Sequence, residues 1–319
     1  MKSIVTGAAG FVGSALCKRL IDMGHEVLAV DAFTDYYSLE LKKSNRLSIG
    51  PNVQFIEESL NNLDLSELIE DVSFIFHQAG QPGVRSSWGR DFDLYSDMNI
   101  LATQKLLEAA RGSKSLRKFV YASSSSVYGD AERYPTDELA RPMPRSPYGV
   151  TKLAAEHLCS LYASNFGVPT VSLRYFTVYG PRQRPDMAFN RFIYSALEGK
   201  SLDVYGDGHQ IRDFTYIEDV VRANIAAALT DTIAGDVFNV SGGSNVSIRK
   251  VISILSTLSG SYLKVNYGDV VPGDVRRTGG DATKIHECLG WRPSVTISEG
   301  LKRQWEYQAM VVNSNASVQ

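Results

Sequence analysis

The chain has 319 residues, a hydrophobic content of 44% and a formal net charge of -2. Nucleic acids and anionic membranes attract a clear excess of lysine and arginine, so this charge balance argues against both as partners. The three cysteines, Cys17, Cys159 and Cys288, lie far apart without metal-ligand spacing, and we expect neither a disulfide framework nor a metal site. There is no signal-peptide pattern and no apolar window of the ~18 residues that a membrane span needs, which favours a cytoplasmic protein.

The first 175 residues alternate short β-branched segments with longer amphipathic ones. Strands are expected at residues 2–7, 26–33, 53–59, 72–80, 117–125 and 169–176. Helices are expected between them, at residues 14–24, 99–112 and 148–167. Such alternation is typical of a parallel sheet that is covered by helices on both faces. The sequence therefore predicts an α/β fold with a doubly wound parallel sheet in residues 1–175.

The pattern becomes less regular after Tyr175. A helix is expected at 189–200, then a strand, a loop and a helix at 201–229, and a strand followed by a helix at 236–260, with Ser247 as the N-cap. We assign residues 176–310 mainly to a smaller C-terminal α/β lobe that binds substrate, with some of the chain returning to the first domain. Residues 311–319 are polar, and we predict that they form a poorly packed tail.

The loop after the first strand, TGAAGFVG, contains Gly7, Gly10 and Gly13. Glycines allow a tight turn, and the helix N-terminus that follows offers free N–H groups and a partial positive charge to a pyrophosphate. Asp31 ends the second strand, where a carboxylate can accept hydrogen bonds from an adenosine ribose and repel a 2′-phosphate. A tight turn without a ligand is the alternative, but the order of strand, loop, helix, strand and acid favours a Rossmann-type domain that binds NAD.

Two further motifs can carry chemistry. In SPYGVTKLAAEHL, Tyr148 and Lys152 are four residues apart, which places both on one face of a helix. The lysine ammonium and a nicotinamide cation would favour the phenolate, so the tyrosine can act as a base near neutral pH despite a free pKa of about 10. Upstream, the serine run in YASSSSVYGD is either loop filler or part of a catalytic centre. Exposed helical Tyr/Lys pairs are common, so this motif gains its weight from the NAD loop and the serines.

Together, TGAAGFVG, YASSSSVYG, SPYGVTK and LRYFTVYGP resemble the extended short-chain dehydrogenase/reductase family of nucleotide-sugar epimerases and dehydratases. The likeness covers about residues 1–308. It implies that Ser124 hydrogen-bonds the sugar hydroxyl that is oxidised, that Tyr148 is the base and that Lys152 is its electrostatic partner. The cofactor-binding residues that it implies are Gly7, Ala9, Gly10, Phe11, Val12, Gly13, Asp31, Ala79, Gly80, Asn99, Tyr148, Lys152 and Tyr175.

The neighbours of Ser124 separate the chemistries of this family. Sugar 4,6-dehydratases resemble TDEVYG, with two acids where this chain has Ser125 and Ser126, and nucleotide-glucuronate decarboxylases usually keep a Glu at the second place. A serine is a poor general acid or base, so both chemistries are disfavoured. The segments DAFTDYYSLELKKSNRL, AGQPGVR, FTVYGPRQRPDMA and RDFTYIEDVV are instead similar to UDP-glucuronate 4-epimerases.

This similarity implies a UDP-sugar substrate, with UDP-glucuronate favoured. An anionic sugar needs a cation and hydroxyl donors around its carboxylate, and Arg184 can offer a directed fork of N–H groups. A surface loop arginine is the alternative interpretation of this residue. The implied substrate-binding residues are Ser124, Ser125, Ser126, Thr177 and Arg184 around the sugar, Arg212 and Arg276 at the diphosphate, Asp274 at the uridine ribose, and Val204 and Tyr205 at the uracil.

Other outcomes stay open at this point. The family also contains 4-epimerases of neutral UDP-hexoses and UDP-glucuronate decarboxylases, and a non-catalytic NAD(H)-sensing protein could use the same fold. In relatives, the helices that correspond to residues 99–112 and 148–163 pair across a dimer, which predicts a homodimer with a four-helix interface. Burial against the chain's own sheet explains the apolar faces of these helices equally well.

Overall fold

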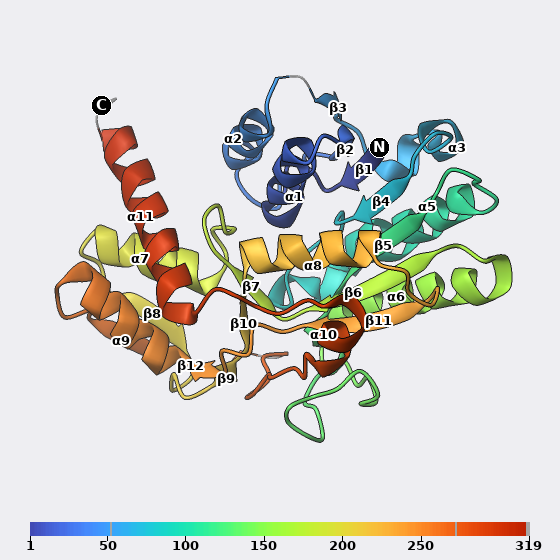
Figure 1. The fold of residues 1–319 in the computed structure, drawn as a ribbon. Helices are drawn as coiled ribbons and strands as arrows, with labels where there is room; N and C mark the ends of the chain where they lie inside the picture. The colour runs from blue at the N-terminus through green and yellow to red at the C-terminus, as the bar shows by residue number, and fades with distance from the viewer. Residues whose placement is uncertain (52, 272, 317–319) are drawn as a thin grey trace.

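A seven-stranded sheet forms the centre of the molecule (Figure 1), and all of its paired strands are parallel. The computed structural model describes residues 1–51, 53–271 and 273–316. The strand order is β11-β6-β5-β4-β1-β2-β3. The bounds are β1 (Lys2–Thr6), β2 (Glu26–Val30), β3 (Gln54–Ile56), β4 (Phe74–His77), β5 (Lys118–Ser124), β6 (Thr170–Tyr175) and β11 (Asp236–Val240). This sheet confirms the predicted doubly wound, Rossmann-type fold.

The helices lie on both faces of this sheet and beyond it (Figure 1). A π-helical segment at Ser96–Leu101 leads into the helix that was expected from residue 99. Ser146 accepts a hydrogen bond from the Gly149 amide and so caps the long helix that carries the YxxxK motif. The bounds are α1 (Phe11–Asp22), α2 (Leu39–Ile49), α3 (Leu65–Leu68), α4 (Phe92–Tyr95), α5 (Ala102–Ala110), α6 (Pro147–Phe166), α7 (Ala188–Leu197), α8 (Ile217–Leu229), α9 (Ile248–Ser259), α10 (Thr283–Leu289) and α11 (Ile297–Ala316).

Alternation along the strands builds a separate apolar core on each face of the sheet. In β1, Ile4 packs with the side chains of α5 and α6, whereas Val5 packs with those of α1 and α8. In β5, Phe119 and Tyr121 face α5 and α6, and Val120 faces the opposite side. Successive strand residues point to opposite faces, so nearly continuous apolar segments are needed when helices cover both.

The C-terminal lobe contains three short two-stranded sheets. They pair β7 (Thr177–Tyr179) with β10 (Phe214–Tyr216), β8 (Leu202–Tyr205) with β13 (Val265–Gly268), and β9 (Ile211–Arg212) with β12 (Val246–Ser247). Helices α7, α9 and α11 pack together beside them (Figure 1). Ser247 caps α9, as predicted, by accepting a hydrogen bond from the Lys250 amide. Strand β11 leaves the lobe and joins the large sheet beside β6.

The C-terminal segment differs from the predicted tail. Helix α11 continues to Ala316, so residues 311–316 are helical, and residues 317–319 lie outside the described part of the chain. Val311 and Val312 are half-buried, and no proline or glycine interrupts the segment after them. Among the residues that the structure describes, no helix combines the length and the apolar character that crossing a membrane requires.

Candidate active site

A cavity of about 670 Å³ lies at the carboxyl ends of the central strands and extends into the C-terminal lobe. It includes the point between β1 and β4 at which the strand order reverses, where open α/β sheets bind their ligands. It brings together most of the predicted site residues. Those that line it are Gly7, Gly10, Phe11, Val12, Gly13, Asp31, Ala79, Gly80, Ser124, Ser125, Ser126, Tyr148, Lys152, Tyr175, Thr177, Arg184, Val204, Tyr205, Arg212 and Asp274.

The glycine loop is shaped for a close backbone approach. Gly7 has a φ of +68°, and a Cβ there would lie 2.8 Å from the Ala79 amide nitrogen. A Cβ on Gly13 would collide with the carbonyl oxygen of Gly7. The first residues of α1 line the cavity next to this loop, and first-turn amides have no partner within a helix. This arrangement fits a pyrophosphate group.

Asp31 is held in place at the next strand end. Its carboxylate accepts hydrogen bonds from the amides of Ala9 at 3.0 Å and Phe33 at 2.8 Å. Ala9 is itself buried, and it contributes through this amide instead of lining the cavity. Lys42 from α2 places its ammonium 3.7 Å from the same carboxylate, a contact that sequence reasoning missed. Burial lowers the pKa of Lys42, and the charge of Asp31 opposes that shift.

Tyr148, Lys152 and Ser124 line the same cavity, and Tyr148 hydrogen-bonds Ser124. Lys152 donates to the Ala122 carbonyl at 2.9 Å, and burial lowers its pKa to about 8. Burial raises the pKa of Tyr148, while a hydrogen bond with Ser124 and the charge of Arg184 lower it. The Ser124 hydroxyl oxygen also accepts a hydrogen bond from the Ser126 amide at 3.1 Å, so the Ser124 hydroxyl proton can still be donated. A phenolate at neutral pH therefore requires a further positive charge in the cavity.

The side of the cavity next to Tyr148 presents hydroxyls and one guanidinium. Arg184 donates from Nε and Nη2 to the two oxygens of Asp186, each at 2.9 Å. Tyr36 hydrogen-bonds Asp186. The Arg184 guanidinium lies over the Tyr36 ring, with 5.9 Å between its Cζ and the ring centroid. Asp186 and Tyr36 were not predicted as site residues. A ligand carboxylate at Arg184 would meet the remaining Nη1 donors or replace Asp186.

The lobe end of the cavity carries further cations. Arg212 pairs with Asp274 at 2.5 Å. Arg85 and Arg191 place their guanidinium groups 4.1 and 5.3 Å from the ring centroid of Tyr205. Neither arginine was assigned a role from the sequence, because the two reach Tyr205 from distant parts of the chain. A planar base and a diphosphate would find aromatic and cationic partners here.

The chain matches the model of the NAD dependent epimerase/dehydratase family over residues 3–241. It belongs to this family. A solved UDP-glucuronic acid 4-epimerase from Bacillus cereus, in complex with UDP-glucuronic acid and NAD, is 46% identical with a TM-score of 0.93, and the match covers 98% of this chain and 100% of that one. An uncharacterized UDP-glucose epimerase of Bacillus subtilis is 44% identical over 96% of this chain and 98% of the relative. A UDP-glucuronate 4-epimerase of Thermodesulfobacterium geofontis is 38% identical over 94% of both chains.

Two more predicted residues of this epimerase/dehydratase family member do not line the cavity. Asn99 is buried, and its amide bonds the Gln81 backbone at 2.7 and 3.2 Å and Thr151 at 2.9 Å. It therefore fixes the backbone of the loop after β4 at Gln81, although its side chain does not line the cavity. Arg276 is 79% exposed and pairs with Asp207 at 3.6 Å, outside the cavity lining. Their predicted contacts with cofactor and diphosphate stay predictions.

Proposed function

We propose that this protein is an NAD-dependent UDP-glucuronate 4-epimerase, which interconverts UDP-glucuronate and UDP-galacturonate. The observation that carries the proposal is the set of groups that line one cavity. The glycine loop, Ser124, Tyr148, Lys152 and Arg184 all face it. The Bacillus cereus relative, which binds UDP-glucuronic acid and NAD, supports the same assignment.

The cavity fits NAD at its Rossmann end. The glycine loop leaves room for a pyrophosphate, and two amides hold Asp31 at the end of β2, where its carboxylate would meet an adenosine ribose. Bound NAD+ would supply the acceptor for a hydride from the sugar C4 and, once reduced, the donor for its return. Lys152 would contact the nicotinamide ribose, and its ammonium would add to the field around Tyr148.

Tyr148 and Ser124 would manage the proton of the sugar 4-hydroxyl. Ser124 donates to the reacting oxygen, and Tyr148 takes its proton while the C4–H bond breaks as a hydride. The resulting 4-keto sugar turns in the cavity and presents its opposite face. Tyr148 would give the proton back to the oxygen as C4 regains its hydrogen on the opposite face, which inverts C4 and restores Tyr148.

A uronic acid brings a side reaction with it. The 4-keto form is a β-keto acid, and it loses CO2 when the bond from C5 to the carboxylate aligns with the carbonyl π system. An epimerase must hold the carboxylate out of that alignment or keep it hydrogen-bonded. Arg184 and the hydroxyls of Thr177, Ser125 and Ser126 would do this, and we infer that these serines favour retention of CO2.

UDP-glucose 4-epimerisation is the second candidate function. One Bacillus subtilis relative carries the name of a UDP-glucose epimerase, and the paired charges of Arg184 and Asp186 would tolerate a neutral sugar. Decarboxylation has less support, because this chain has Ser126 at the position where decarboxylases of the family usually keep a Glu. An NAD(H) sensor has least support, because Ser124, Tyr148 and Lys152 meet in one cavity.

A side-by-side turnover assay tests the proposed function. We expect the purified protein to convert UDP-glucuronate to UDP-galacturonate with little CO2, and to act on UDP-glucose at least ~10-fold more slowly in kcat/KM, since a directed contact to a charged group contributes about 1.5–3 kcal/mol. Product identity is read by chromatography and NMR, and CO2 by trapping. Faster turnover of UDP-glucose, or pentose as the main product, would contradict the assignment.

We propose a division of labour between the two parts of the chain. Residues 1–175 would hold NAD and the catalytic groups, and residues 176–310 would bind the nucleotide sugar. Arg212 and Tyr205 from the lobe fit the latter role, since they face the same cavity as the glycine loop. The free cysteines fit a reducing cytoplasm, which is where we place the protein.

We also propose a homodimer through the outer surfaces of α5 and α6. Large apolar side chains are exposed on α6 and on the π-helical segment that leads into α5, including Leu101 at 40%, Val150 at 47% and Leu161 at 53%. Leu161→Glu on α6 is expected to convert a dimer to a monomer in analytical ultracentrifugation, because a buried charge without a partner is costly. Leu47→Glu, at an 81% exposed position on α2, is the matched control and should leave the dimer intact. A dimer that survives the Leu161 change would refute this interface.

A further inference from the structure

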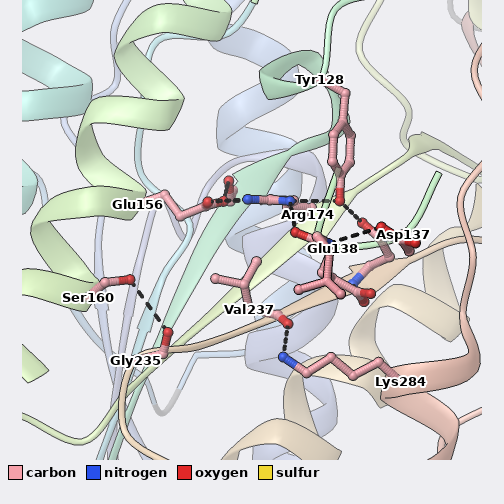
Figure 2. Close-up of polar contacts among 12 residues, drawn as sticks. Tyr128, Asp137, Glu138, Glu156, Ser160, Arg174, Gly235, Val237 and Lys284 are labelled. Atoms are coloured by element: carbon pink, nitrogen blue, oxygen red, sulfur yellow. Dashed lines mark hydrogen bonds and ion pairs between the residues drawn. The ribbon is translucent and has the colours of Figure 1, made fainter. Parts of the chain in front are cut away.

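A buried ion pair shares helix α6 with Tyr148 and Lys152. Glu156 on α6 is 2% exposed and Arg174 on β6 is 4% exposed. Arg174 donates from Nη2 to Oε1 of Glu156 at 2.6 Å and from Nε to Oε2 at 3.0 Å. Figure 2 shows the guanidinium lying between the Glu156 carboxylate and the Tyr128 hydroxyl. This two-point geometry leaves the carboxylate little freedom to rotate.

Ser123 is the third member of this group. Its hydroxyl donates to Oε2 of Glu156 at 2.6 Å, so both carboxylate oxygens are occupied. Ser123 stands opposite Arg174 in the β5–β6 register. Neighbouring strand residues on one face lie side by side, which explains how one carboxylate can reach both. The serine that the sequence left without a chemical role therefore anchors α6.

The network continues across the sheet from Arg174. Its Nη1 donates to the Tyr128 hydroxyl at 2.7 Å and to the Glu138 carbonyl at 3.3 Å (Figure 2). Tyr128 in turn donates to the side chain of Asn239 at 2.7 Å, and Asn239 stands opposite Arg174 in the β6–β11 register. Polar side chains from three adjacent strands thus form one bonded row beneath α6.

Stability alone does not explain this arrangement. Removing two charges from water is costly, and replacing a buried ion pair by apolar side chains of similar size is often neutral or stabilising. The position of the pair suggests another reason. Glu156 follows Lys152 by one helical turn and Tyr148 by two, so all three lie along one side of α6. Ser123 immediately precedes Ser124, and the Ala122 carbonyl accepts a hydrogen bond from the Lys152 ammonium.

We propose that Ser123, Glu156 and Arg174 are positioning residues for epimerisation. We call these three residues the α6 clamp. Consecutive residues of β5 are bonded to consecutive turns of α6, Ala122 to Lys152 and Ser123 to Glu156. The clamp sets the distance from the Tyr148 phenol to the Ser124 hydroxyl, the two groups that share the sugar proton. This inference rests on the roles proposed above for Ser124, Tyr148 and Lys152.

Ser123→Ala tests the clamp, with Ser3→Ala as a matched control. Ser3 is also a fully buried strand serine, and its hydroxyl bonds His25 at 2.8 Å, in the strand next to β4 and away from the cavity. We expect kcat of Ser123→Ala to fall about tenfold with KM and bound NAD unchanged, since misplacing reacting groups by about 1 Å can cost about 10²-fold. Ser3→Ala should lower the melting temperature comparably and keep kcat within about twofold.

Two further variants decide the outcome. Ser123→Thr keeps the hydroxyl on a strand that suits β-branched residues, and it should restore most of the lost kcat. Glu156→Gln keeps the shape of the side chain, and it should lower kcat at least as much as Ser123→Ala while NAD stays bound. Equal kcat values for Ser123→Ala and Ser3→Ala, or no rescue by threonine, would overturn the proposal. If Tyr148→Phe is inactive in that case, the proposed role of the α6 clamp is refuted while the proposed function stands. An active Tyr148→Phe variant would instead refute Tyr148 as the base.

Discussion

Replacing Tyr148 by phenylalanine is expected to lower kcat by about 10²–10⁴-fold, the usual contribution of a positioned acid or base. The variant loses the hydroxyl that we propose takes the proton of the sugar 4-hydroxyl. The ring itself is expected to stay in place, because it packs edge-on against Tyr95 with 6.3 Å between ring centroids. Bound NAD, measured after denaturation, should therefore remain at the level of the unmodified protein.

Tyr262→Phe is a suitable control for this change. It removes the same hydroxyl from a side chain that is 91% exposed and outside the cavity lining, and it should leave kcat unchanged. Substantial turnover by Tyr148→Phe would refute the base assignment. Loss of NAD from that variant would show that the Tyr148 hydroxyl, which the family resemblance also implies as a cofactor contact, is needed to hold NAD.

Arg184→Ala is expected to change the product as well as the rate. A hydrogen bond to a charged group contributes about 1.5–3 kcal/mol, so removing the guanidinium should raise the ratio of UDP-pentose to epimer about tenfold or more. The physical reason is that the carboxylate of the 4-keto sugar loses a donor that resists its discharge as CO2. The measurement is the amount of CO2 and pentose formed per epimer from UDP-glucuronate.

Arg182→Ala is the matched control for the product ratio. Arg182 belongs to the same loop, but its guanidinium bonds Asn45 of α2 at 3.0 Å and does not line the cavity. The pentose fraction of this variant should stay at the original level. Equal loss of both products after the Arg184 change, without additional pentose, would count against carboxylate holding.

Much of the fold and the NAD end of the site could be predicted from the sequence. The glycine loop and the YxxxK motif work through residues that are close in the chain, and local spacing places them on one turn or one helix face. The strands were recognisable because parallel strands buried on both faces need apolar, β-branched segments. The same local reasoning found the cap at Ser247.

Contacts between distant segments decided the rest. Arg85 and Arg191 flank Tyr205, and α11 continues through a segment that looked like a polar tail. Sequence spacing carries no information on such pairs, because a contact between two side chains depends on where the fold brings two segments of the chain together. The serine run shows this division clearly. The sequence excluded acids beside Ser124, but only the packing of α6 on β5 and β6 showed that Ser123 holds Glu156, because that contact joins residues 33 positions apart.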